Sequence, residues 1–489
     1  MSSRQFSIEV VVAVAGASVL SVGVALLPST AVLPVAVGAA VIGCVLAPAP
    51  TALACWAIIG LVPEWSVDVA LLPVLATQAY RSLAGPVSAA DVLLGAGLTA
   101  SLVVQPTAVR EFVHRHRSIL YAYALFLLVV FLSVVRNGQL GALIPLKPLF
   151  YLGSAVLWGF AVGLSDRTTA WIGPLFVCIA VLVILQGLTN SLIGSGRAFA
   201  GLHLAFYDRA SVYILILYVV FVAQAWMVRS PLLRGAATPA WFGLAIAAVL
   251  VTAFSLRRTM WLTLVGALVV SVYLHAHRGT RRLILHVAAG SIIAVTGLGG
   301  ALAATGYLKP VIIHATSLVS TISGAGAEQS ITTRIAETAD VLRAIRRRPI
   351  IGNGPAYAYA ASGSYALALD RTYVHNNYLW LLMHYGVLGL VTFAGLGIAT
   401  LTALGREYRA VAPTDGPGLA RLVLLAGLLG LLPALAGDSF ITAHARWPIL
   451  LGFLVGAALA HASASDAVAS AMPNAPRIGR GSPQPPGAP

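Results

Sequence analysis

The chain has 489 residues, of which 59% are hydrophobic and only 9% are charged, and its mean hydropathy is +0.91. Ordinary globular proteins carry about 25% charged residues, so this composition excludes a soluble globular fold. The net charge is +15, but the basic residues lie mostly in short gaps between apolar runs, where they set membrane topology and do not indicate nucleic-acid binding. The sequence therefore predicts a polytopic membrane protein.

Apolar runs long enough to cross the ~30 Å hydrocarbon core of a bilayer recur along the whole chain. They predict an all-α transmembrane bundle of about 12–14 helices. The run that begins at Thr51 stops at Pro63 and is followed by Glu64 and Asp68, so a re-entrant helix is the alternative there. The runs begin near Ile8, Ala31, Thr51, Val87, Ser118, Ile144, Ala170, Ala210, Pro239, Thr259, Arg282, Asn376, Gly418 and Arg446.

Lysine and arginine in alternate gaps set the expected orientation. With the N-terminus inside, the inner gaps hold 15 basic residues and the short outer gaps hold 8. Seven more lie in one long outer connection, where the positive-inside rule carries little weight. The excess on the inner side predicts that both termini are cytoplasmic.

The pattern divides the chain into four parts. We expect N-terminal transmembrane helices in residues 1–304, a large extracytoplasmic loop in residues 305–374 and C-terminal transmembrane helices in residues 375–462. Residues 463–489 are rich in Ala, Ser, Pro and Gly and have too little apolar periodicity to fold. They are predicted to form a disordered cytoplasmic tail.

The large loop contains one strong helical pattern, over residues 330–348. Its apolar residues share one helical face, and Pro349 ends the pattern. This favours an amphipathic helix lying on the outer membrane surface. The face is formed by Ile331, Ile335, Leu342 and Ile345.

Basic residues are more frequent at the outer ends of the helices than topology requires. An anionic substrate at the outer leaflet, such as a lipid-linked diphosphate, explains the excess. The alternative for any one of them is a side chain that extends to lipid phosphates. Those in short outer gaps are Arg81, Arg136, Lys147, Arg197, Arg209, Arg257, Arg258 and Arg446.

His375 stands at the predicted outer mouth of a helix and is followed by Asn376 and Asn377. A half-solvated histidine there can remain neutral near pH 7 and accept a proton from a hydroxyl. A capping or headgroup-binding histidine is the alternative. Other candidate bases on the outer side are Asp438, His444, Glu64 and Asp68, whereas Asp91 follows Ser88 in a helix-capping pattern.

Three blocks of sequence stand out: SLRRTMWL at 255–262, RIAETADVLRAIRRRPIIGNGPAYAYA from Arg334, and HNNYLWLLMHYGVLGLVTF from His375. Together they resemble the superfamily of O-antigen ligases and O-antigen polymerases. Thr338 departs from the family, where a tryptophan is common, and Arg257 replaces the serine of the usual Ser-Arg pair, which Arg258 completes. Residues on the family's pattern in the last two blocks are Arg334, Pro349, Gly352, Gly354, His375, Asn376, Tyr378, Leu379, Gly386, Gly389 and Phe393.

The resemblance implies a bundle similar to the GT-C class of glycosyltransferases, in a bacterial inner (plasma) membrane, with its active site on the extracytoplasmic face. It implies transfer from a polyprenyl-diphosphate-linked glycan to a hydroxyl of a polysaccharide or glycolipid acceptor, without a metal or other cofactor. The chain contains no DxD motif. Carried over residue by residue, the catalytic set is His375, Arg258 and Arg334. The expected substrate-binding set is Arg197, Arg209, Arg257, Asn376, Tyr378, Gly352, Gly354 and Arg446.

Other functions fit a protein of this kind. A repeat-unit polymerase of the same superfamily carries the same motifs, so ligase against polymerase stays open. A transporter of lipid-linked sugars would place charges near the membrane midplane and show repeated halves. Here the charges gather at the outer ends, and the large loop has no counterpart in the other half. A peptidoglycan polymerase of the shape-and-division type would also be multi-helical, but its motifs are not found.

Overall fold

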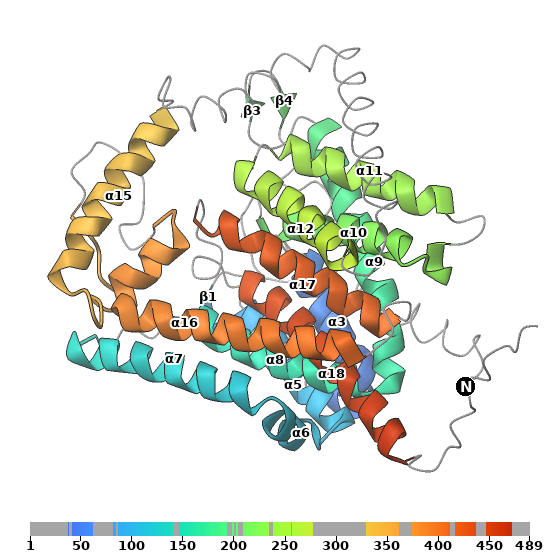
Figure 1. The fold of residues 1–489 in the computed structure, drawn as a ribbon. Coiled ribbons are helices and arrows are strands. Elements are labelled where there is room, and N and C mark those ends of the chain that lie inside the picture. The colour runs from blue at the N-terminus through green and yellow to red at the C-terminus, as the bar shows by residue number, and fades with distance from the viewer. Residues whose placement is uncertain are drawn as a thin grey trace, which may run out of the picture.

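The computed structural model describes residues 38, 42–61, 82–84, 87–139, 146–192, 198–199, 202–203, 209–233, 238–255, 257–276, 329–360, 374–410, 416–436 and 446–471. Almost all of these residues are helical (Figure 1). The helices are α3 (Pro48–Leu61), α5 (Ala89–Val104), α6 (Ala108–Arg115), α7 (Arg117–Arg136), α8 (Lys147–Leu164), α9 (Asp166–Leu192), α10 (Arg209–Met227), α11 (Thr238–Phe254), α12 (Arg258–Ala276), α15 (Gln329–Arg347), α16 (Asn377–Ala410), α17 (Gly416–Ala434) and α18 (Arg446–Ala471), with a short 3-10 helix at Pro231–Leu233. Two small hairpins pair β1 (Ser82–Ala84) with β2 (Val87–Ser88), and β3 (Ala198–Phe199) with β4 (Leu202–His203).

Five helices in the described ranges are long and apolar enough to cross a membrane. Helices α5 and α6 pass the same test together but bend by 91° where they meet. The helices begin close to the apolar runs predicted from Thr51 to Thr259 and from Asn376 onward. The runs at Ile8 and Arg282, and the start of the run at Ala31, lie outside the described residues. The predicted all-α polytopic bundle is therefore confirmed. The five spans are Arg117–Arg136, Lys147–Leu164, Thr168–Thr189, Arg209–Met227 and Asn377–Arg406.

Two helices differ in length from the predicted runs: α3, which corresponds to the run at Thr51, and α18, which was expected to end near Ala462. Helix α3 has 14 residues and ends at Leu61, and at about 1.5 Å per residue it is shorter than a full span. Helix α18 continues to Ala471, beyond the Ala462 boundary, and residues 472–489 lie outside the described residues.

Helices α8 and α18 form the closest helix pair of the core through two Gly-x-x-x-Gly motifs. A β-carbon on Gly159 of α8 would lie 1.9 Å from the carbonyl oxygen of Phe453, and one on Gly456 of α18 would lie 1.9 Å from that of Val156. Because glycine has no β-carbon, the two helix backbones can approach closely. Close packing of this kind drives helix association in lipid, where the hydrophobic effect does not. The remaining glycines of the two motifs are Gly163 and Gly452.

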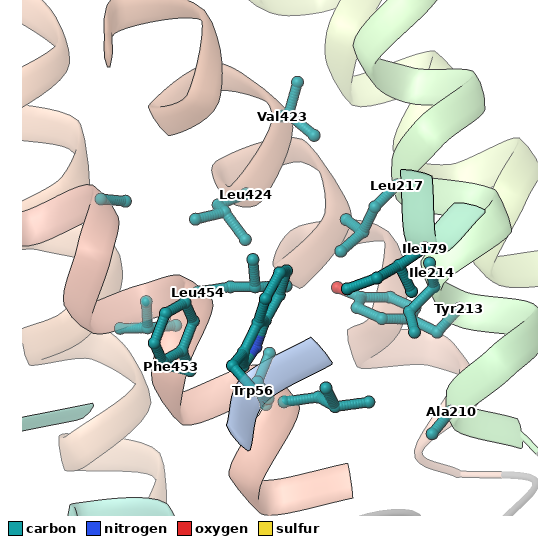
Figure 2. Close-up of a cluster of buried hydrophobic side chains, with 14 of the residues drawn as sticks. Trp56, Ile179, Ala210, Tyr213, Ile214, Leu217, Val423, Leu424, Phe453 and Leu454 are labelled. Atoms are coloured by element: carbon teal, nitrogen blue, oxygen red, sulfur yellow. The ribbon is translucent and has the colours of Figure 1, made fainter. Parts of the chain in front are cut away.

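Aromatic side chains close the core beside this pair. Phe453 stacks on Trp56 of α3 with ring centroids 4.8 Å apart, and it meets the edge of Trp158 at 5.1 Å. Figure 2 shows Trp56 between Phe453 on one side and Tyr213 of α10 on the other. The short helix α3 is thus held in the bundle by its buried tryptophan.

A second, smaller core lies beneath α15, at the end of the bundle where α16 begins (Figure 1). It joins Phe126 of α7, Val341 and Ala344 of α15, and Tyr385 of α16. Helix α15 matches the amphipathic helix predicted at residues 330–348, but Ile335 and Leu342 of the expected apolar face are 64% and 41% exposed. Ile345 of the predicted face packs against this core, and the buried residues beside it are Glu337, Asp340, Val341 and Ala344.

His116 joins α6 to α7 and is buried against two phenylalanine rings. Its ring lies 5.4 Å from that of Phe112 and 5.5 Å from that of Phe160, and the side chain is 3% exposed. Burial lowers the pKa of His116 to about 4, and the charge of the adjacent Arg115 acts in the same direction. The unfolded chain binds this proton near pH 6.5 and the folded chain only near pH 4, so the stability contributed by His116 is lost as the pH falls through this window.

We expect His116→Phe to flatten the pH dependence of stability below pH 6.5. At pH 5 the neutral histidine costs the wild type on the order of 2 kcal/mol, which the phenylalanine ring avoids. The measurement is the thermal midpoint of the detergent-solubilised protein at pH 7 and pH 5. The exposed His114, two residues away, gives the control variant His114→Gln, which should retain the wild-type dependence. A steep loss at pH 5 in His116→Phe would contradict this assignment.

Candidate active site

Helix α16 begins just after His375 and is interrupted at Gly386. Gly386 has φ 67° and ψ −167°, a conformation open essentially to glycine alone, and the helix resumes at Val387. A break of this kind leaves amides and carbonyls without partners inside the helix. The turn at residues 349–354 supplies those partners.

The turn and the broken helix satisfy each other's backbone groups in both directions. The amides of Val387 and Leu388 donate to the carbonyls of Pro349 and Ile350, at 2.8 and 3.2 Å. In return, the amides of Asn353 and Gly354 donate to the carbonyls of Met383 and His384, both at 2.9 Å. We call this arrangement of residues 349–354 and 383–388 the interlock.

Side chains from the turn, from α7 and from α16 tighten the interlock. The Asn353 amide group donates to the carbonyls of Ala344 and Met383, at 3.2 and 3.1 Å, and therefore fixes the end of α15 to α16. Ser133 of α7 donates to the His384 carbonyl at 2.9 Å. The His384 ring contacts the Gly354 carbonyl at 2.7 Å, so it faces the turn.

Gly352 and Gly354, expected to bind substrate, lie within this packed turn. Both are buried with positive φ, and a β-carbon on Gly352 would lie 2.4 Å from the His384 backbone. Their described contacts are with the chain itself. A role in substrate binding stays a prediction for these two glycines.

The first turn of α16 is fixed beside His375. The side chain of Asn376 accepts from the amides of Tyr378 and Leu379, at 3.0 and 3.1 Å, which is a helix N-cap. The Tyr378 hydroxyl donates to the carbonyl of Leu432 at 2.7 Å, and the Asn377 amide donates to that of Leu435 at 2.9 Å. Asn376 therefore caps α16, while Tyr378 and Asn377 brace it against the end of α17. The predicted contact of Asn376 and Tyr378 with substrate stays a prediction.

His375 is paired with a carboxylate that the sequence did not single out. Its Nδ1 atom lies 3.0 and 3.1 Å from the two carboxylate oxygens of Glu337, and its backbone amide donates to Oε2 at 3.3 Å. The Tyr359 hydroxyl donates to Oε1 at 3.3 Å. The Glu337 side chain is 3% exposed and that of His375 is 22% exposed, so the acid is enclosed while the histidine reaches the surface.

The predicted arginines occupy several places around this end. Arg334 is exposed and stands three residues before Glu337 on α15. Helix α12 begins at Arg258 and packs along α17, with Gly266 against Gly430. Its first turn lies toward the end of α17 that contacts the start of α16 (Figure 1). Arg257 is half-buried just before that turn, and Arg209 is half-buried at the start of α10. Arg197 lies outside the described residues.

Arg446 is fully buried at the start of α18. Its guanidinium donates to the carbonyls of Ile59 and Gly60, the last turn of α3, and to the Ser211 hydroxyl at 2.9 Å. A cation at a helix C-terminus is favoured by the helix dipole. Arg446 therefore joins α18 to α3 and α10, and it presents no exposed surface to a substrate.

Among the other candidate acids and bases, the capping role of Asp91 is confirmed, and the remaining four lie outside the described residues. Asp91 forms the predicted capping box with Ser88, and it also pairs with Lys147 at 2.7 Å. Glu64, Asp68, Asp438 and His444 lie outside the described residues. Within the described ranges, no group of three or more His, Cys, Asp and Glu side chains is arranged as a metal site.

The fold and this site define an all-helical, multi-pass membrane protein with a histidine–carboxylate pair at one end of the bundle. Residues 240–394, which include most of α11 and all of α12, α15 and the interlock, match the family described as O-antigen ligase. This match to part of the chain supports a membrane glycosyltransferase of the ligase or polymerase type. A comparison with curated proteins found no match.

We expect Gly386→Ala to disrupt the interlock. A β-carbon there would lie 2.3 Å from the Ile350 backbone, and the conformation itself costs about 1–3 kcal/mol for a residue other than glycine. The readouts are the thermal midpoint in detergent and the yield of monodisperse protein, both of which should fall. The matched control is Gly395→Ala on the same helix, where a β-carbon meets nothing within 4 Å and the helix should be as stable or more so. Equal behaviour of the two variants would show that the interlock does not hold the fold.

Proposed function

We propose that the protein transfers a glycan from a polyprenyl-diphosphate-linked donor to a hydroxyl of a polysaccharide or glycolipid acceptor, at the extracytoplasmic face and without a metal. The observation that carries this proposal is the partly exposed His375, fixed at the first turn of α16 and backed by the enclosed carboxylate of Glu337. The O-antigen ligase match over residues 240–394 supports the reaction class.

The chemistry requires a base and a stabilised leaving group. The His375 ring removes the proton from the acceptor hydroxyl as its oxygen attacks the anomeric carbon. The bond between that carbon and the diphosphate oxygen breaks, and its electron pair leaves with the diphosphate. Charge builds up on the diphosphate as the sugar departs, so guanidinium donors placed there lower the barrier.

Arg334 and Arg258 are the residues proposed to hold the diphosphate. Arg334 is exposed on the helix that carries Glu337, and Arg258 begins a helix at the same end of the bundle. A guanidinium offers a planar, bidentate donor set that matches phosphate oxygens. We also propose supporting contacts from Arg209 and Arg257, which lie at the starts of α10 and α12.

The proposal predicts transfer by the purified protein in proteoliposomes that contain a polyprenyl-diphosphate-linked glycan and an acceptor. Transfer should survive a chelator, because arginines take the place of a metal. His375→Ala should reduce turnover by about 10²–10⁴-fold while donor binding stays near wild type. Arg258→Ala or Arg334→Ala should instead weaken donor binding by about 1.5–3 kcal/mol and lower turnover as well.

The same assay contains its controls. Arg258→Lys should not fully restore activity, since a point charge cannot reproduce the planar guanidinium. The length distribution of the product separates a ligase, which transfers intact chains, from a polymerase, which makes ladders. Metal-restored activity after chelation would contradict the metal-free site, and near-normal transfer by His375→Ala would remove His375 as the base.

The proposed location is a bacterial plasma membrane, with both termini in the cytoplasm and α15 outside. In a chain whose Cys44, Cys55 and Cys178 are replaced, a cysteine at the exposed Ala339 of α15 should react with a membrane-impermeant maleimide on intact cells. A cysteine at the exposed Thr107, between α5 and α6, should react only after permeabilisation. The reverse pattern would place the site on the cytoplasmic face and exclude the proposed donor side.

A further inference from the structure

Glu337 is enclosed although it lies on a helix whose arginines Arg334, Arg346 and Arg347 are exposed. Burial of a carboxylate is unfavourable unless hydrogen bonds satisfy its oxygens. Here the His375 ring, the His375 backbone amide and the Tyr359 hydroxyl all contact them. Two of these three contacts come from His375, so the carboxylate is matched to that residue.

We propose that Glu337 is the positioning residue of the transfer reaction. It keeps a proton on Nδ1 of His375, so that Nε2 carries the lone pair that receives the proton of the acceptor hydroxyl. Glu337 touches no substrate and acts through the imidazole ring. The inference rests on the proposed function and deepens it.

The tautomer follows from the donor and acceptor roles of the two groups. In a neutral imidazole one nitrogen carries hydrogen and the other carries the lone pair, and a hydrogen bond at one nitrogen decides the state of the other. An ionised carboxylate accepts hydrogen bonds and donates none. With both Glu337 oxygens within 3.1 Å of Nδ1, hydrogen on Nδ1 is the arrangement that forms a bond.

The same pair stabilises the charge that forms during the reaction. When Nε2 takes the hydroxyl proton, the ring becomes a cation that remains bonded through Nδ1–H to the carboxylate. Glu337 stays ionised throughout, as an acid that orients a catalytic histidine does. The acceptor oxygen forms its bond to the anomeric carbon, and the electron pair of the broken bond leaves on the diphosphate, so no further reactant is needed.

Asp340 provides a matched comparison on the same helix. It is buried three residues after Glu337, but it pairs with Arg343 on α15 itself. Replacing either acid by its amide removes one negative charge from the buried face of α15. Of the two acids, Glu337 is the one whose carboxylate lies 3.0 Å from the His375 ring.

The test compares Glu337→Gln with Asp340→Asn in the full-length protein, reconstituted in proteoliposomes with a lipid-diphosphate-linked glycan and an acceptor. Glu337→Gln should lower kcat by about 10–100-fold with the donor KM near wild type, as for other carboxylates that orient a functional histidine. The acidic limb of its pH–rate profile should move to lower pH, because the lost carboxylate no longer favours the protonated ring. Asp340→Asn should retain the wild-type limb.

A structural role for Glu337 gives a different set of results. Wild-type kcat and pH profile in Glu337→Gln would overturn the inference, as would a loss no greater than that of Asp340→Asn with an unmoved limb. Glu337→Asp keeps the charge on a shorter side chain. Its acidic limb in the pH–rate profile should return close to the wild-type position, while its kcat should recover less fully. This variant also keeps the test decisive if Glu337→Gln does not fold.

A measurement without substrate separates this inference from the proposed function. In protein labelled with ¹⁵N-histidine, the His375 signals are assigned by their loss in His375→Ala, and the wild-type ring should show a protonated Nδ1 and a bare Nε2. Glu337→Ala should lose that preference. Hydrogen on Nε2 of the wild-type ring would overturn the role of Glu337 whatever the reaction. Full transfer by His375→Ala would instead remove the proposed base and leave the tautomer result standing.

Discussion

The break in α16 is the constraint on which the rest of this end of the molecule depends. A helix interrupted at Gly386 must find partners for its orphaned amides and carbonyls, and the turn at 349–354 is the segment that provides them. Because that turn follows α15 directly, satisfying the helix also determines where α15 lies. The placement of α15 in turn brings Glu337 against His375. Backbone hydrogen bonding at the interlock therefore sets the geometry of two side chains that are 38 residues apart.

His375 is held from two sides by groups with different functions. Below it, the Asn376 cap and the bond from Asn377 to Leu435 fix the first turn of α16 against α17. Beside it, Glu337 fixes the ring, and Tyr359 fixes Glu337 in the smaller core. A base must be held close to its productive geometry to contribute fully, and side chains supported by rigid helices achieve this better than those on free loops. The histidine is consequently a surface-reaching group on a rigid support.

The sequence predicted the helices well because apolar runs report membrane burial directly, and α7, α8, α10 and α12 begin where those runs begin. It could not show which face of α15 is inward, since Ile335 and Leu342 suggested an apolar side while the packing side includes Glu337. An acid among arginines is indistinguishable in sequence from half of a surface ion pair. Arg446 was misjudged for a similar reason: its position marked an outer cation, but only the packing of α3, α10 and α18 shows it buried on helix carbonyls.

The arrangement on α15 separates two electrostatic roles along one helix. Its acids Glu337 and Asp340 are both buried, while Arg334, Arg343 and Arg346 are exposed, so the outward surface of the described part of the helix is cationic. An exposed carboxylate near the proposed donor site would repel a diphosphate and compete for its arginines. Enclosed beside His375, the same charge favours the protonated ring that proton transfer creates. In the proposed reaction, one helix presents cations to the leaving group and a carboxylate to the base, with burial keeping the two functions apart.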